Sequence, residues 1–167
     1  MPEIEEGKSE GTSPEMASRI AELREDLRRA KSQSRANLAG EIRDMGFSCQ
    51  GCGECCQGED NSVLVFPFEI RSIQEATGLS WAEVATPPEE GEWDREGYFH
   101  TLEWRLAKVG EACRFYLGGV CAIYPVRPML CRSYPFYLDR GKLMASECRG
   151  LGGEIEAGEA ERLAEQL

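Results

Sequence analysis

The chain has a single histidine, few basic residues and no long apolar run. Because His100 is the only histidine, a zinc site of two cysteines and two histidines is excluded. Nineteen basic residues against thirty acidic ones give a net charge of -11, which repels phosphate backbones and anionic lipid surfaces alike. No apolar run reaches the ~20 residues that a membrane-spanning helix needs. We therefore expect neither a nucleic-acid partner nor a membrane partner.

The first residues also lack the apolar core of a secretory leader, because Met1 to Glu6 is an acidic stretch. We therefore predict a cytoplasmic protein whose cysteines stay reduced. No nucleophile with an adjacent base stands out, since His100 has no recognisable partner and the carboxylates are scattered along the chain. These absences name no reaction and leave open whether the protein is an enzyme.

The chain is rich in cysteine. It has eight cysteines, and four of them form the run C-x2-C-x2-C-C over residues 49–56. The eight are Cys49, Cys52, Cys55, Cys56, Cys113, Cys121, Cys131 and Cys148. Two overlapping C-x2-C steps place successive thiolates on one side of a tight turn, as in zinc and iron-sulfur sites. Gly51, Gly53 and Gly58 allow positive φ and inward-pointing N–H groups. We call residues 49–56 the cysteine knuckle and interpret all eight cysteines as metal ligands.

A disulfide framework is the alternative use of eight cysteines, and inert or redox-sensing thiols are a third. The missing leader counts against disulfides, as do the adjacent Cys55 and Cys56, whose side chains would normally diverge. A chain of ~150 residues also buries roughly two-thirds of its unfolded surface and can fold without covalent links. Metal binding is therefore the preferred interpretation.

The spacing of Cys49, Cys52 and Cys55 matches the first three ligands of a bacterial ferredoxin run, which favours an iron-sulfur cluster such as [4Fe-4S]. The run then departs from that pattern, because Cys56 follows at once and Gln57 stands where no proline is found. A remaining ligand must therefore come from the second cysteine segment. Zn2+ in one or two four-cysteine sites is the alternative.

Arg114, Arg127 and Arg132 are the candidate residues for offsetting the negative charge of a thiolate centre. They lie close in sequence to Cys113 and Cys131. We expect one or more of them to stabilise the sulfurs from outside the ligand set. Ordinary surface pairing with the many carboxylates is the alternative role for each.

The chain divides into four regions by composition and periodicity. These are a disordered acidic tail (1–12), a long amphipathic N-terminal helix (13–46), a cysteine-cluster metal-binding domain (47–153) and a C-terminal helix (154–167). The N-terminal stripe contains Ile20, Leu23 and Leu27, and it could lie on its own domain or dock a protein partner, a second copy included. The C-terminal stripe is sparse, so we expect that helix to pack weakly or fray.

Shorter elements are expected inside the cysteine-cluster domain. They are a strand at 63–66, helices opening at Pro67 and at Ser80, an acidic loop at 89–96, a strand at 98–109 containing a core Trp104, and hairpins around Gly118-Gly119 and 139–141. The first hairpin would place Cys113 and Cys121 on neighbouring rungs. We predict an α+β fold: a small, irregular, metal-organised domain of short strands and hairpins behind the N-terminal helix.

The cysteine-bearing segments together resemble the CxxCxxCC cysteine-cluster family, a family of zinc- or iron-chelating domains. The matching segments are Cys49-x2-Cys52-x2-Cys55-Cys56, Cys113-Arg114-Phe115-Tyr116-Leu117, Cys121-Ala122-Ile123-Tyr124 and Arg127-Pro128-Met129-Leu130-Cys131-Arg132-Ser133-Tyr134-Pro135-Phe136. The resemblance covers residues 47–150 and implies a metal site without an established reaction. Flagellin lysine N-methylases are similar more distantly, and they combine this pattern with methyl transfer from S-adenosylmethionine. This chain is short for that activity, and it has neither a Gly-rich strand-to-helix loop nor a C-x3-C-x2-C run.

From the sequence we therefore expect a metal-organised binding or redox module that holds an iron-sulfur cluster or zinc. An iron-sulfur enzyme of the methyl-transfer or electron-transfer type is the alternative.

Overall fold

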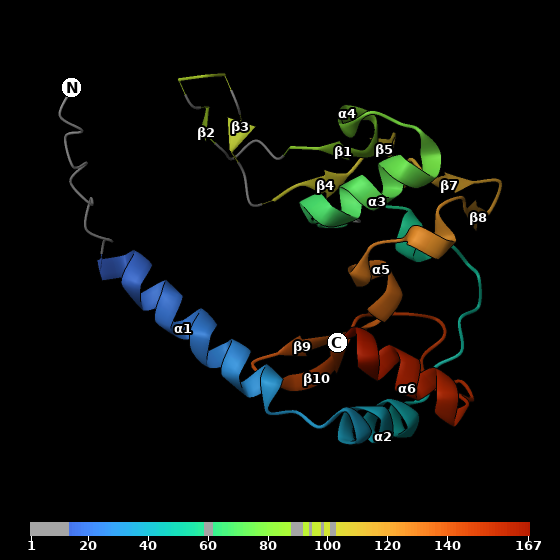
Figure 1. The fold of residues 1–167 in the computed structure, drawn as a ribbon. Coiled ribbons are helices and arrows are strands. Elements are labelled where there is room, and N and C mark those ends of the chain that lie inside the picture. The colour runs from blue at the N-terminus through green and yellow to red at the C-terminus, as the bar shows by residue number, and fades with distance from the viewer. Residues whose placement is uncertain (1–13, 59–61, 88–91, 94, 98, 101–102) are drawn as a thin grey trace.

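The computed structural model describes every residue except 1–13, 59–61, 88–91, 94, 98 and 101–102 (Figure 1). The predicted acidic tail lies outside the described residues. The helices are α1 Pro14–Lys31, α2 Arg35–Met45, η1 Glu54–Cys56, α3 Pro67–Thr77, α4 Trp81–Val84, η2 Tyr124–Val126, α5 Met129–Ser133 and α6 Ala157–Gln166. The strands are β1 Ala85–Thr86, β2 Glu92–Trp93, β3 Phe99–His100, β4 Arg105–Leu106, β5 Lys108–Val109, β6 Ala112–Cys113, β7 Tyr116–Leu117, β8 Val120–Cys121, β9 Phe136–Asp139 and β10 Lys142–Ala145. This mixture of helices and short antiparallel pairs is the expected α+β fold.

The N-terminal helical region consists of two helices rather than one. α1 ends at Lys31 and α2 begins after Ser34, whose hydroxyl accepts a hydrogen bond from the backbone N–H of Asn37 (3.4 Å). Serine favours this capping position over a helix interior, because its hydroxyl competes for backbone partners. Both segments are helical, as expected, but the chain changes direction between α1 and α2 (Figure 1).

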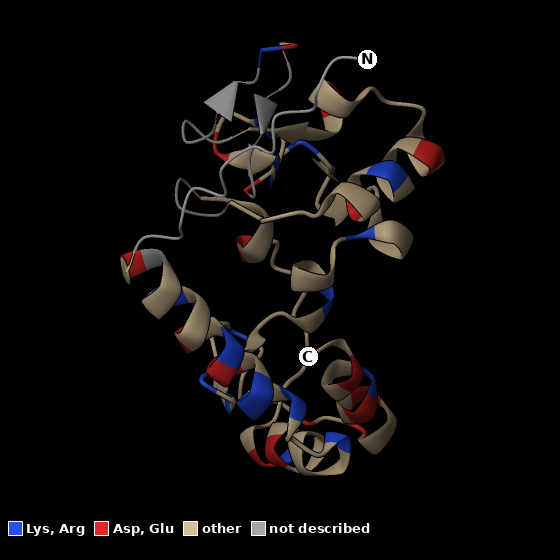
Figure 2. Cartoon of the chain, turned by 60° about the vertical axis from the view of Figure 1, so that its left-hand side comes forward, with Lys and Arg blue, Asp and Glu red and all other residues tan. Residues whose placement is uncertain are grey.

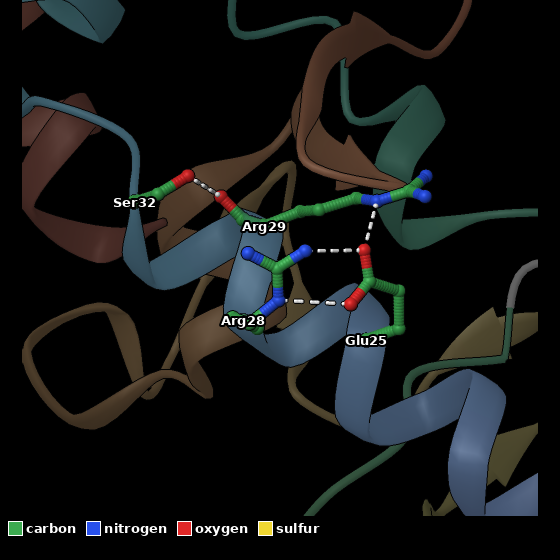
Figure 3. Close-up of polar contacts among 4 residues, drawn as sticks. All are labelled: Glu25, Arg28, Arg29 and Ser32. Atoms are coloured by element: carbon green, nitrogen blue, oxygen red, sulfur yellow. Dashed lines mark hydrogen bonds and ion pairs between the residues drawn. The ribbon is translucent and has the colours of Figure 1, made fainter.

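α1 extends away from the rest of the molecule (Figure 1), and its surface carries a cluster of ion pairs. The carboxylate of Glu25 accepts hydrogen bonds from Arg28 (2.8 Å) and Arg29 (2.9 Å), and the Ser32 hydroxyl donates to the Arg29 carbonyl (Figure 3). The hydrogen bonds from these guanidinium groups lower the pKa of Glu25 to about 2. Because the depressed pKa belongs to the carboxylate, the cluster persists at neutral pH and is lost only as the pH falls to that value.

α2 and α6 form the first hydrophobic cluster, together with the hairpin β9–β10. We call it the α2–α6 cluster. Its buried members are Leu38, Ala39, Ile42, Phe47, Phe136, Leu143, Ala160, Leu163 and Ala164. Charged residues of both signs lie on the two helices (Figure 2). Arg35 of α2 pairs with Glu165 of α6 (3.2 Å).

The expectation that the C-terminal helix packs weakly is wrong. Ala160, Leu163 and Ala164 are each at most 5% exposed and lie in the α2–α6 cluster. Small alanines at helical spacing let α6 approach α2 closely, so a stripe that looks sparse in large side chains still buries a face.

A matched pair of leucine truncations tests this packing. Leu163→Ala is expected to lower the free energy of unfolding by about 2–5 kcal/mol, because it leaves a cavity in a closed cluster. Leu27→Ala, on α1 where the side chain is 53% exposed, should change it by less than about 0.5 kcal/mol. Urea unfolding followed by circular dichroism measures both variants, and equal losses would contradict the packing described for α6.

The second hydrophobic cluster surrounds α3 and α4, and we call it the α3–α4 cluster. Its buried members are Val65, Ile70, Ile73, Val84, Ala85, Leu106, Phe115 and Ile123. Trp104 packs against it as predicted, with its ring edge-on to Trp81 at 5.4 Å between centroids. The expected helices at Pro67 and Ser80 are confirmed as α3 and α4.

The strand predictions are confirmed in part. Residues 63–66 form only a bridge, Leu64 to Arg105, and the predicted strand 98–109 is divided among β3, β4 and β5, with residues 98, 101 and 102 outside the description. The predicted acidic loop at 89–96 contains a short strand, β2, which pairs with β3. Residues 89–91 and 94 of that loop are not described.

Both predicted hairpins are present. β7 pairs with β8 across Gly118-Gly119, and β9 pairs with β10. Cys113, however, is not on the first hairpin, because it pairs with Lys108 in β5–β6 while Cys121 pairs with Tyr116. Tight turns set these registers locally, so the chain builds two successive two-residue pairings instead of one long ladder. Within the described residues, no helix is long and apolar enough to cross a bilayer.

Candidate metal centre

The cysteine knuckle is a glycine-shaped turn that closes in the single turn η1. The backbone N–H of Cys56 donates to the Gly53 carbonyl (2.9 Å). Gly51 and Gly53 have φ of +62° and +72°, which confirms the predicted need for glycine here. The adjacent thiols of Cys55 and Cys56 lie 4.0 Å apart, sulfur to sulfur, within hydrogen-bonding distance and without a disulfide bond.

Backbone pairing fastens the N-terminal side of the knuckle to the segment that carries Cys148. Phe47 bridges Leu151, and the backbone N–H of Ser48 donates to the Gly150 carbonyl (2.9 Å). An ion pair, Arg149 to Glu54 (2.6 Å), adds a side-chain link between the same two segments. This pairing brings Cys148 beside the knuckle across about a hundred residues of intervening chain.

A second pairing fastens the C-terminal side of the knuckle to the segment that carries Cys113. Gln57 bridges Ala112, and the backbone N–H of Gly58 donates to the Glu111 carbonyl (3.0 Å). The Lys108 ammonium donates to the Gly58 carbonyl (2.8 Å). Both ends of the knuckle are therefore held by the two chain segments that carry cysteines of the second set.

The ring of Tyr116 covers the middle of the knuckle. A Cβ placed on Gly53 would overlap the phenol ring of Tyr116, including its hydroxyl oxygen. Gly53 therefore serves two purposes, a positive φ and a close approach of the ring. Nothing in the sequence marks Tyr116, because its contact lies more than sixty residues away.

All eight cysteines are free thiols in the structure, and they differ in exposure. Cys49, Cys52 and Cys55 are exposed. The other five are half-buried, and they are Cys56, Cys113, Cys121, Cys131 and Cys148. Cys113 and Cys121 pack on the α3–α4 cluster, whereas Cys148 packs on the α2–α6 cluster. The cysteine region thus lies where the two hydrophobic clusters meet.

Electrostatic interaction between thiols shows which of them are neighbours. Burial first, and then negative charge on Cys113, Cys121 and Cys55, raises the pKa of Cys131 to about 12. Burial likewise raises the pKa of Cys56 to about 12, with contributions from Cys55, Cys113 and Cys121. These five sulfurs, from four different elements, form one interacting group.

The exposed knuckle cysteines join the same neighbourhood through Cys55. Although the Cys55 residue is exposed as a whole, partial desolvation of its thiol raises the pKa, and charge on Cys49 and Cys52 adds to the effect. Tyr134 has a raised pKa first because of burial and then because of Cys148, Cys55 and Cys52. Seven cysteines are thus coupled to one another, and Cys148 adjoins them through Tyr134.

The donor chemistry of this region fits a soft metal. Thiolates select zinc and iron-sulfur clusters, and a cation is what allows several crowded thiols to lose their protons together. Among the residues that the structure describes, no three cysteine, histidine or carboxylate side chains are arranged closely enough to hold an ion. The structure therefore shows neighbouring cysteines but no coordination sphere among the described residues.

The three candidate arginines occupy different surroundings. Arg127 lies over the Tyr124 ring (3.7 Å to its centroid), and its charge lowers the pKa of Cys131 against the larger effect of burial. Arg114 pairs with Glu83 (3.6 Å), and Arg132 donates to the Arg127 carbonyl (2.8 Å).

An open cleft lies next to Cys148. It has a volume of about 500 Å³ and is lined by Glu54, Tyr134, Glu147, Cys148 and Arg149. The Tyr134 hydroxyl donates to the Glu147 carbonyl (2.7 Å), which fixes the phenol at the cleft wall. The cleft gives solvent a route to one edge of the cysteine region.

Comparison with protein families finds a match over the cysteine region. The model of the CxxCxxCC family, described as "Putative zinc- or iron-chelating domain", matches residues 48–149, more than half of the chain. The match begins just before the knuckle and ends just after Cys148, so it contains all eight cysteines. No solved structure matches the chain.

Proposed function

Because the chain belongs to the CxxCxxCC family of zinc- or iron-chelating domains, we propose that its eight cysteines hold an iron-sulfur cluster or zinc and that the protein works as a metal-organised binding or redox module. One observation carries the ligand assignment. Backbone pairing on both sides of the knuckle brings Cys148 and Cys113 to it from distant parts of the chain. Convergence of sulfurs from separate segments is what a thiolate centre requires.

The knuckle spacing favours iron-sulfur over zinc. Cys49, Cys52 and Cys55 keep the ferredoxin-like intervals, and the further ligand comes from the second segment, in which Cys113, Cys121 and Cys131 neighbour Cys55. Zinc would use the same sulfurs in one or two tetrahedral sites. In either case Arg127 is the proposed charge partner, because its charge acts on Cys131. A reducing cytoplasm suits such thiolates.

Anaerobic purification distinguishes the two metals. We expect brown protein with broad absorption near ~400 nm that is lost on reduction, and iron and acid-labile sulfide in equal amounts. Colourless protein with stoichiometric zinc would replace the cluster assignment with the zinc assignment. Protein that carries neither metal and takes up neither on reconstitution would contradict the proposal as a whole.

Substitution of a single knuckle cysteine tests the ligand assignment. Cys52→Ser is expected to lose most of the bound metal and to unfold at a lower temperature, because serine supplies no thiolate. Gln50→Ser changes an exposed neighbour in the same turn and should keep the metal content of the wild type. Metal analysis of both variants tests the assignment. A Cys52→Ser protein with unchanged metal content and stability would show that Cys52 is not a ligand.

An enzyme is the second candidate function, favoured by the open cleft at Cys148. A metal centre with solvent access on one edge could bind a substrate, whereas a purely structural centre is closed. In that case a small-molecule ligand should perturb the absorption or paramagnetic resonance spectrum of the reconstituted centre.

A further inference from the structure

Glu69 is one of two polar residues that are buried in the described chain, with 6% of its surface exposed. A carboxylate at this depth requires hydrogen-bond donors for both of its oxygens. It has them: Oε2 accepts from the backbone N–H of Phe66 (2.9 Å) and Oε1 accepts from the backbone N–H of Met129 (2.7 Å). The second bond spans sixty positions of sequence and joins α3 to α5.

The first of these bonds is ordinary helix capping, but the second is not. Glu83 occupies the same third position in α4, where it accepts from Ser80 (2.9 Å) and stays exposed at the surface. A glutamate that only caps its own helix has no need of burial. The burial of Glu69 therefore follows from its contact with Met129.

This contact sets the position of the turn that carries Cys131. α5 has only five residues, and its preceding residue, Pro128, offers no side-chain cap. The carboxylate of Glu69 supplies the acceptor that α5 lacks at its first residue. Cys131 lies two residues further along the same turn, so the hydrogen bond to Met129 fixes the position of the backbone from which the Cys131 side chain projects.

α5 also lies between the two halves of the molecule. It packs against α6 on one side, while Glu69 ties it to α3 on the other (Figure 1). Cys113 and Cys121, whose charges act on Cys131, pack on the α3–α4 cluster, and α3, the helix that carries Glu69, contributes Ile70 and Ile73 to that cluster. Glu69 thus links α5, which carries Cys131, to the helix whose cluster supports Cys113 and Cys121.

We propose that Glu69 is a positioning residue for the metal centre: its buried carboxylate, bonded to the first residue of α5, holds Cys131 within reach of Cys113 and Cys121. The inference rests on the proposed function, since it assigns Cys131 to the ligand set. Glu69 itself is not a ligand, because both of its oxygens are engaged by backbone donors.

Cobalt(II) added to the metal-free full-length protein under anaerobic conditions tests this role. Thiolate-to-cobalt charge transfer gives an ultraviolet absorption whose intensity rises with the number of bound thiolates. In Glu69→Ala we expect the absorption intensity to fall by the contribution of one thiolate–cobalt bond. We expect the cobalt affinity to fall by about 10–100-fold. Glu69→Gln keeps one acceptor oxygen and should recover part of both losses.

Ile73→Val provides the matched control. It loosens the same helix and the same cluster but removes no hydrogen bond, so it should keep the full cobalt spectrum. Glu69 variants that match Ile73→Val in intensity and affinity would overturn the positioning role. If Glu69→Ala does not fold, Glu69→Gln decides by the same comparison. A wild-type protein that gives no cobalt-thiolate absorption and binds no other metal would overturn the proposed function, and the role of Glu69 with it.

Discussion

Removal of the metal is expected to separate the two hydrophobic clusters and to abolish cooperative unfolding. The clusters are small, and the cysteine segments lie between them, with Cys148 on one side and Cys113 and Cys121 on the other. Structural thiolate sites contribute roughly 10–16 kcal/mol of binding free energy, which is as large as the ~5–15 kcal/mol of a whole domain. A centre placed at this junction would therefore account for much of the stability of the fold.

Thermal unfolding and hydrogen exchange measure this effect. We expect the chelated protein to melt at a lower temperature over a broader range, and the amides of α3 and α4 to exchange faster than those of α2 and α6. The α2–α6 cluster should resist longer because two full helices and a hairpin of two four-residue strands close it. Restoring metal to the chelated sample is the control. Identical melting and exchange before and after chelation would show that the centre contributes nothing to the junction.

A methyl group added at Gly53 is expected to cost both metal and folding. The residue has φ +72°, which costs an alanine about 1–2 kcal/mol, and its new Cβ would overlap the Tyr116 ring. Tyr116 belongs to β7, so relief of the overlap displaces its phenol ring and, where the ring cannot rotate aside, the hairpin with it. That movement would carry Cys121, which pairs with Tyr116, away from Cys56.

Gly51→Ala is a closely matched control for this change. Gly51 lies in the same knuckle at φ +62°, but no atom comes within 4 Å of the position that a new methyl group would take there. The free energy of unfolding of Gly51→Ala should fall only by the cost of the positive φ, and this variant should keep its metal. Gly53→Ala should lose most of its metal. Metal content and urea unfolding of both variants give the comparison. The double variant Gly53→Ala with Tyr116→Ala should regain metal, and equal behaviour of the two single variants would exclude the Tyr116 contact as the cause.

Features that depend on neighbouring residues were predictable. The glycines of the knuckle, the Gly118-Gly119 hairpin and the helices opened by Pro67 and Ser80 are set by local backbone preferences, and the structure has each of them. The division between α1 and α2 at Ser34 was equally local, but the apolar stripe on either side of it hid the capping signal.

Contacts between distant segments were not predictable in the same way. The sequence shows eight thiols but not that Cys113 leaves the hairpin of Cys121, nor that Arg127 rather than Arg114 acts on Cys131. The packing of α6 depended on alanines, whose burial follows from the approach of α2 and not from their own hydrophobicity.

The sequence by itself determined the donor chemistry of this protein, because thiols at C-x2-C-x2-C-C spacing favour a soft metal whatever surrounds them. Only the tertiary structure decided how the donors meet: the pairings at both ends of the knuckle, the Tyr116 ring over Gly53 and the carboxylate of Glu69 under α5. The physical reason is the separation along the chain over which each kind of interaction acts. Backbone preference acts over a few residues, whereas a metal centre built from distant segments depends on packing and buried hydrogen bonds that exist only once the chain has folded.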